Sequence, residues 1–188
     1  DGAPLKDAVI EIVSPQIPVP DDWDFKGLMD QVDKEFIGNV VAIVSGSYVS
    51  FPNSDDIQHH VYSFSDNNSF DVPLYSGTNA EPILFDQSGV TVVGCNIHDW
   101  MLGYVYVDET TLAIKTDENG QAVLDGVPEG TYTVSVWHPR ATEGSPELQH
   151  AVEFSDAEPS PLRLAVTLVG GRRVRGALNG PGTGYGCG

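Results

Sequence analysis

Short apolar runs separated by turn residues fill most of the chain, and they argue against a mainly helical fold. Helical periodicity is almost absent, whereas the alternation typical of strands recurs throughout. Asn119-Gly120 is a type I′ hairpin signal, and Pro128-Glu129-Gly130 marks another turn. The pattern therefore predicts an all-β protein. We expect strands at 8–13, 39–45, 48–52, 60–64, 83–85, 91–95, 103–107, 112–116, 122–124, 132–138, 151–154 and 162–168, and one short helix near 25–32.

The composition allows one large or two small globular domains. The sequence has 188 residues, of which 40% are hydrophobic, and such a chain can bury a sizeable core. No apolar run approaches the ~18 residues that a membrane span needs. The chain opens at Asp1 with no signal peptide, which suits either a processed mature protein or a trimmed chain. We expect the protein to work in the periplasm or outside the cell.

The charge of the chain is strongly negative, with 27 acidic and 9 basic residues and a net charge of −18. All 27 acidic residues but only six of the basic ones lie in 1–170, which gives that part a charge of −21. Such a field repels nucleic acid and anionic membranes and attracts cationic partners. Solubility alone is the alternative interpretation of the same charge.

Two segments lack the alternation of strands. Residues 14–22 are rich in proline and predict a connector. Residues 170–188 are rich in glycine and have no apolar period. We expect this last segment to be a tail that becomes ordered only when a partner binds it.

One short segment concentrates residues that bind soft metal ions. Cys95, His98 and Met101 follow one another in the spacing Cys-x2-His-x2-Met between two expected strands. A second imidazole must come from elsewhere, and His59 and His60 lie upstream at the mouth of another expected strand. Two histidines and one cysteine in a trigonal set, with a weak axial methionine, form the ligand set of blue copper.

Each of these residues has a simpler interpretation when it is taken alone. A lone buried cysteine or methionine usually packs in a core, and a histidine pair on a loop is usually solvated. A disulfide between Cys95 and Cys187 is a further alternative in a secreted chain. Zinc also accepts cysteine and histidine, but a thioether in fourth position argues against a structural zinc site. The joint spacing favours copper.

Residues 25–107 resemble the cupredoxins, particularly the plastocyanin and amicyanin group and the cupredoxin-like proteins labelled methylamine utilisation proteins. The segment QHHV at 58–61 is similar to the family's Pro-His-Asn-Val, and this match implies that His59 is the ligand. The segment CNIHDWM at 95–101 resembles the short amicyanin-type ligand loop. The resemblance implies a Greek-key β-sandwich that holds one type 1 copper ion through the metal ligands His59, Cys95, His98 and Met101.

The chain departs from the family pattern at three positions. His60 stands where the family has an asparagine that ties the two ligand loops together, so His60 either takes over that role or competes as a ligand. Gln58 replaces the usual proline. Asp99 replaces a frequent proline and brings a negative charge beside His98.

A second module surrounds the first. The segment DGAPLKDAVI at 1–10 resembles the opening of the carboxypeptidase regulatory-like, transthyretin-type β-sandwich, and the stretch after 107 resembles its later strands. The resemblance implies that 1–20 forms the first part of this sandwich and the connector, and that 108–169 forms the remainder of the sandwich. Residues 25–107 would then be the cupredoxin domain, inserted in or joined to the sandwich, and 170–188 the tail. The family's usual first strand is missing, which leaves a sheet edge open to a partner or to a second copy of the chain.

The resemblance implies electron transfer rather than catalysis. A single copper ion would change between Cu(I) and Cu(II), and electrons would pass through His98, with Ile97, Trp100 and Leu102 as an apolar docking rim. The expected partner is a redox protein such as a cytochrome or a dehydrogenase, and the negative charge of this chain favours a cationic one.

Two other functions remain open at this point. One is a structural, adhesive or self-assembling β-sandwich protein in which copper is stabilising or vestigial. The other is copper storage or delivery, although a closed site with four ligands releases its metal poorly.

Overall fold

The computed structural model describes residues 2–13, 19, 21, 24, 26–78, 80–110, 112–124, 127–142, 148–155 and 161–169. Strands and turns make up this part of the chain, which contains no α-helix, so the all-β prediction is confirmed. A search of the same residues finds no helix long and apolar enough to cross a membrane. The strands form sheets of five, three, two and four strands.

The five-stranded sheet carries the ligand-bearing segments. Its order is β5 (Val40–Val44), β11 (Leu102–Asp108), β10 (Gly89–Gly94), β7 (His59–Phe64) and β8 (Ser69–Tyr75). The β5–β11 pair is parallel and the other pairs are antiparallel. On β7 the alternate residues Val61 and Ser63 are buried, and so is Val93 on β10, so one face of the sheet belongs to a core.

Two smaller sheets cover that face. One contains β2 (Lys26–Leu28), β6 (Ser47–Ser50) and β9 (Ile83–Phe85), and the other is the hairpin of β3 (Asp30–Val32) and β4 (Glu35–Ile37). Phe36, Val49 and Phe85 from these sheets pack in one buried cluster with residues of β7, β10 and β11. The result is a β-sandwich, and its core extends to Cys95 and Met101.

The four-stranded sheet joins distant parts of the chain. Its order is β12 (Ala113–Lys115), β1 (Val9–Val13), β13 (Gly130–Trp137) and β14 (Gln149–Phe154), with every pair antiparallel. The first strand thus lies between two late strands, and the whole five-stranded sheet is built from the chain between them. Ile12 and Val134 lie in a small core on one face of the four-stranded sheet.

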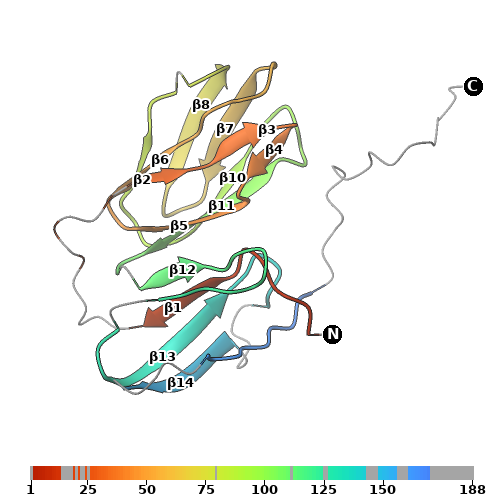
Figure 1. Ribbon diagram of the computed structural model, residues 1–188. Helices are drawn as coiled ribbons and strands as arrows, with labels where there is room; N and C mark the ends of the chain where they lie inside the picture. Colours follow the sequence, from red (N-terminus) through yellow and green to blue (C-terminus); the bar gives the residue numbers. More distant parts are fainter. Residues whose placement is uncertain are drawn as a thin grey trace, which may run out of the picture.

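The other face of this sheet contacts the outer face of the five-stranded sheet. The rings of Tyr104 and Tyr106 on β11 lie 5.7 and 5.5 Å from the ring of Trp137 on β13. The Tyr106 hydroxyl donates a hydrogen bond of 2.7 Å to the Glu11 carboxylate on β1. Figure 1 shows β12 beside β5, so the two sheets meet along β5 as well as along β11.

Three sequence-based expectations about these elements are wrong. Residues 26–28 and 30–32 form β2 and β3 rather than a helix. A Cβ on Gly27 would lie 3.1 Å from the side chains of Ile43 and Val49, so tight packing against the sandwich overrides local preference there. Residues 122–124 and 162–168 form no strand, although Leu124 and Leu164 pack against the core of the four-stranded sheet.

The edge strand β8 has no counterpart among the predicted strands. It contains Pro73, which cannot donate a ladder hydrogen bond and therefore weakens a strand prediction. Because β8 is the last strand of the five-stranded sheet, its outer side needs no such donor.

Candidate metal centre

His59 begins β7, and its side chain points into the core with none of its surface exposed. The ladder between β7 and β8 shifts register between His59 and Val61, which marks a bulge at the start of the strand. The loop before His59 is fixed by the buried amide of Asn53, which donates to the carbonyl oxygens of Ile57 at 2.8 Å and Tyr75 at 2.9 Å. The loop therefore presents His59 in a defined position.

The second ligand segment is the loop that connects β10 to β11. Gly94 and Leu102 face each other as the last ladder pair, so the ends of the loop are held together. Inside the loop, the Met101 amide donates to the His98 carbonyl at 2.9 Å, and the Cys95 amide donates to the Met101 carbonyl at 3.4 Å. These bonds hold the loop closed and direct Cys95 and His98 to the same side.

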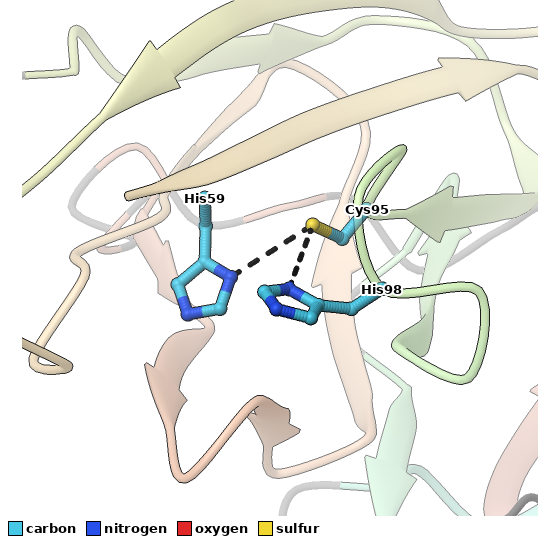
Figure 2. A group of neighbouring side chains, drawn as sticks. All are labelled: His59, Cys95 and His98. Carbon is cyan, nitrogen blue, oxygen red and sulfur yellow. Dashed lines mark hydrogen bonds between the residues drawn. The ribbon is translucent and has the colours of Figure 1, made fainter. Parts of the chain in front are cut away.

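The structure brings together three of the four predicted ligands. The Cys95 sulfur lies 3.8 Å from His59 Nδ1 and 3.6 Å from His98 Nδ1. Potential ligand atoms of all three residues lie within 4.8 Å of one another. Figure 2 shows both Nδ1 atoms turned toward the sulfur. Cys95 is a buried free thiol, and Cys187, the partner in the alternative disulfide, lies outside the described residues.

These separations fit a single metal ion between the three side chains. With metal–nitrogen bonds of about 2.0 Å and metal–sulfur bonds of about 2.3 Å, angles between tetrahedral and trigonal give sulfur–nitrogen separations of about 3.5–3.7 Å. The sulfur–nitrogen separation of 3.6 Å to His98 lies within this range, and that of 3.8 Å to His59 lies just above it. Two imidazoles and a thiol also suit soft or borderline ions such as copper and zinc.

Met101 lies in the same buried cluster as Cys95, with 2% of its surface exposed. The thioether is therefore kept from water in the apolar surroundings of the three other side chains. A buried thioether in the same cluster as Cys95 can serve as a weak, soft fourth ligand, whereas calcium and magnesium need hard oxygen donors.

His60 does not join the centre. Alternation along β7 turns it away from the core side on which His59 lies, and its Nε2 pairs with an Asp71 carboxylate oxygen at 2.9 Å. Its ring lies 5.5 Å from that of Tyr62, which follows it on the outer face. Neither of the roles considered for His60, competing ligand or tie between the loops, matches this placement.

Asp55 is a site residue that the sequence pattern did not reveal. One carboxylate oxygen lies 2.6 Å from His59 Nε2, on the far side of the ring from Cys95. The carboxylate also accepts hydrogen bonds from the backbone amides of Asp33 at 2.6 Å and Lys34 at 2.9 Å. Burial alone would raise the pKa of Asp55, but the bonds from Lys34, His59 and Asp33 together lower it below its ordinary value.

His98 lies nearer to the surface than His59 and is partly buried. Its ring centroid is 5.3 Å from that of Trp100 and 4.9 Å from that of His59. Burial, and then the neighbouring His59 and Lys34, lower the pKa of His98, which favours the neutral imidazole that a metal ion needs. Ile97, beside it, has 49% of its surface exposed.

No protein-family model matches the chain, and no curated protein matches it either. Among solved structures, the Cu-containing nitrite reductase from Thermus scotoductus SA-01 is 22% identical with a TM-score of 0.43, and the match covers 53% of this chain but 25% of that one. The purple cupredoxin from Nitrosopumilus maritimus is 20% identical with a TM-score of 0.38, over 44% of this chain and 98% of that one. Amicyanin from Paracoccus versutus is 22% identical with a TM-score of 0.41, over 53% and 97% of the two chains.

Proposed function

We propose that the protein is a type 1 (blue) copper electron carrier whose metal ligands are His59, Cys95, His98 and Met101. The observation that supports this most directly is the convergence of His59 Nδ1, Cys95 Sγ and His98 Nδ1 within 4.8 Å at the edge of a β-sandwich core. Two imidazoles, a thiolate and a thioether are the donor set that would hold a type 1 copper ion.

The donor set favours copper over zinc. Structural zinc sites are closed by four strong cysteine or histidine ligands, and a thioether is a poor substitute for one of them. Copper bound in such a set supplies a one-electron step between Cu(I) and Cu(II). The protein's part is to keep Cys95 and His59 buried and fixed, so that little rearranges when the charge of the site changes.

The path for electrons in this proposal runs through His98. It is the more exposed of the two histidine ligands, and Ile97 and Leu102 beside it expose 49% and 40% of their surfaces. An apolar rim around a metal ligand lets a partner protein approach closely and exclude water. The net negative charge of the chain suits a basic redox partner.

We propose a carrier rather than an enzyme. In the described part of the chain, His59, Cys95 and His98 form the one group of histidine, cysteine and carboxylate side chains placed to hold a metal ion. A copper oxidase would need a further metal centre at which substrate is bound.

We also propose that 25–107 is the electron-transfer domain and that 1–20 and 108–169 form the transthyretin-like module. The placement of β1 between β12 and β13 supports an insertion of the first module into the second. The resemblance to cupredoxins further leads us to propose a site of action outside the cytoplasm, in the periplasm or beyond the cell.

Addition of Cu(II) to the purified, metal-free protein tests the proposal. We expect an intense absorption band in the red part of the visible spectrum, since a copper–thiolate bond gives strong charge transfer. One equivalent of Cu(II) saturates the band, and Zn(II) added first suppresses it without producing colour. A protein that stays colourless after Cu(II) addition overturns the proposal and favours a structural role for the sandwich.

A further inference from the structure

The hairpin of β3 and β4 reaches the metal centre through its two turn residues. Asp33 and Lys34 connect the two strands, and both have positive φ angles, 53° and 62°. Two successive positive φ angles are typical of a type I′ turn, which usually requires glycine or asparagine. A lysine in this conformation is strained, and strain of this kind persists where surrounding contacts enforce it.

The contacts that enforce this turn come from Asp55. The amides of Asp33 and Lys34 both donate to its carboxylate, at 2.6 and 2.9 Å. The same carboxylate accepts from His59 Nε2 at 2.6 Å. The Asp55 side chain is largely buried, with 11% exposed, whereas Asp33 and Lys34 themselves lie at the surface. The charge of the carboxylate strengthens all three hydrogen bonds.

The other side of the turn contacts the second ligand loop. The Lys34 carbonyl accepts a hydrogen bond of 3.0 Å from the Trp100 indole nitrogen. Trp100 in turn lies against the ring of His98, with 5.3 Å between the ring centroids. One turn therefore contacts both histidines, His59 through Asp55 and His98 through Trp100.

We propose that this turn is a clamp that holds both histidine side chains in position for the metal, with Asp55 and Trp100 as its positioning residues. This inference rests on the metal site proposed above. The clamp connects the two ligand loops, which is one of the two roles considered for His60. His60 contacts Asp71 and therefore does not fill that role.

The effect of Asp55 on His59 follows from hydrogen-bond chemistry. An ionised carboxylate can only accept, so His59 Nε2 carries the proton and Nδ1 presents its lone pair toward Cys95. Without this partner, the ring would exchange between its two neutral forms, and one of them would block the ligand atom. Loss of such a partner typically weakens metal binding by about 10–100-fold.

The first experiment compares Asp55→Ala with Asp71→Ala. Both variants remove a carboxylate that pairs with a histidine on β7, but only Asp55 contacts a proposed ligand. We expect Asp55→Ala to weaken Cu(II) binding about 10–100-fold and to raise the reduction potential, because an anion that favours Cu(II) is lost. Asp71→Ala should change neither quantity. Equal behaviour of the two variants overturns the clamp.

The nitrogen chemical shifts of the histidine rings give a readout in the metal-free protein. Nuclear magnetic resonance of the wild type should show His59 as the form protonated at Nε2, and Asp55→Ala should show a mixture of forms. Asp55→Asn, which keeps an acceptor oxygen but not the charge, should restore part of the Nε2 form. A His59 form that is the same in all three proteins contradicts the role of Asp55.

Trp100→Phe tests whether the two halves act as one unit. The variant removes the donor to Lys34 and keeps an aromatic ring beside His98. If one clamp holds both histidines, the double variant Asp55→Ala/Trp100→Phe loses less Cu(II) affinity than the two single losses combined. Fully additive losses overturn a single clamp.

The wild type separates the failure of the clamp from the failure of the proposed function. If it binds no Cu(II), the metal site is wrong, and the ring nitrogen shifts alone decide whether Asp55 fixes His59. If the wild type is blue and Asp55→Ala matches it in affinity and potential, the clamp alone is wrong. Circular dichroism of each metal-free variant verifies that the fold is retained.

Discussion

His60 Nε2 lies 2.9 Å from an Asp71 carboxylate oxygen, between the neighbouring strands β7 and β8, on the face of the sheet that points away from the metal centre. We therefore expect His60→Ala to retain one equivalent of Cu(II), and His59→Ala to lose tight binding. The two variants are matched, since each removes one imidazole from adjacent positions. Copper analysis after removal of free metal measures the difference. The reverse ranking would assign the ligand to His60.

The thiol of Cys95 is the strongest donor of the proposed site. Cys95→Ser should abolish the red absorption band, because an alcohol oxygen gives no comparable charge transfer to copper. The matched control is Cys187→Ser, which removes the other cysteine of the chain and should leave the spectrum unchanged. An intense band that persists in Cys95→Ser contradicts the assignment of this ligand.

Bound metal should stabilise the fold. The three side chains converge only in the folded chain, so the ion binds the native state in preference to the unfolded one. Free metal at 1,000 times the dissociation constant stabilises a protein by about 4 kcal/mol. We expect the melting temperature to fall when copper is removed by a chelator. In Cys95→Ser the same treatment should have a much smaller effect, and an equal shift in both proteins would argue against the site.

The pKa of Asp108 is raised, whereas that of Asp55 is lowered. Asp108 should therefore make the free energy of unfolding fall as pH rises, and Asp55 should make it rise. It has 6% of its surface exposed, and its Oδ2 has no hydrogen-bond partner among the described residues. Burial, with the negative charge of Glu11, raises the pKa of Asp108 above its ordinary value of 3.8, despite hydrogen bonds from Thr110. A carboxyl whose pKa is raised by folding contributes its full stability below the unfolded pKa, and this contribution is lost as pH rises through the folded pKa.

Asp108→Asn removes this contribution. The difference in unfolding free energy between variant and wild type should therefore change in favour of the variant as pH rises above about 4. Urea unfolding at a series of pH values measures this difference, in which contributions from other carboxyls cancel. A difference for Asp108→Asn that does not change with pH would show that the group is not perturbed by folding.

The strands that could be predicted from the sequence are those marked by their own residues, either by alternation or by an apolar run between turn signals. Residues 83–85 were predicted as a strand with the bounds of β9, because apolar residues there are flanked by clear turn signals. Strands β2 and β8 depend on partners instead. Gly27 fits β2 only because Ile43 and Val49 leave no room for a side chain, and Pro73 fits β8 only because that strand is an edge.

The same distinction applies to the metal centre. Cys95 and His98 are close in sequence, so their spacing alone predicted that they meet. Asp55 was missed because two of its partners are backbone amides of a turn 22 and 21 residues away, and amides leave no trace in the residue pattern. His60 could not be placed because a shift of one residue along a strand reverses its face, and the bulge at the start of β7 affects that register.

Charge and the apolar rim should affect electron transfer in different ways. Residues 1–170 hold all 27 acidic residues of the chain, so long-range attraction should speed association with a basic cytochrome. The Debye length falls from about 30 Å at 0.01 M salt to about 10 Å at 0.1 M, so we expect the rate to fall as salt is added.

Ile97→Ser should lower the rate at every salt concentration, because the rim acts at contact. Val123→Ser, which alters an apolar residue that is 73% exposed beside the four-stranded sheet, is the matched control. Stopped-flow mixing with one basic and one acidic cytochrome measures these rates. A rate with the basic partner that is flat across salt would mean that the charge serves solubility, and an unaffected Ile97→Ser would place the electron path away from His98.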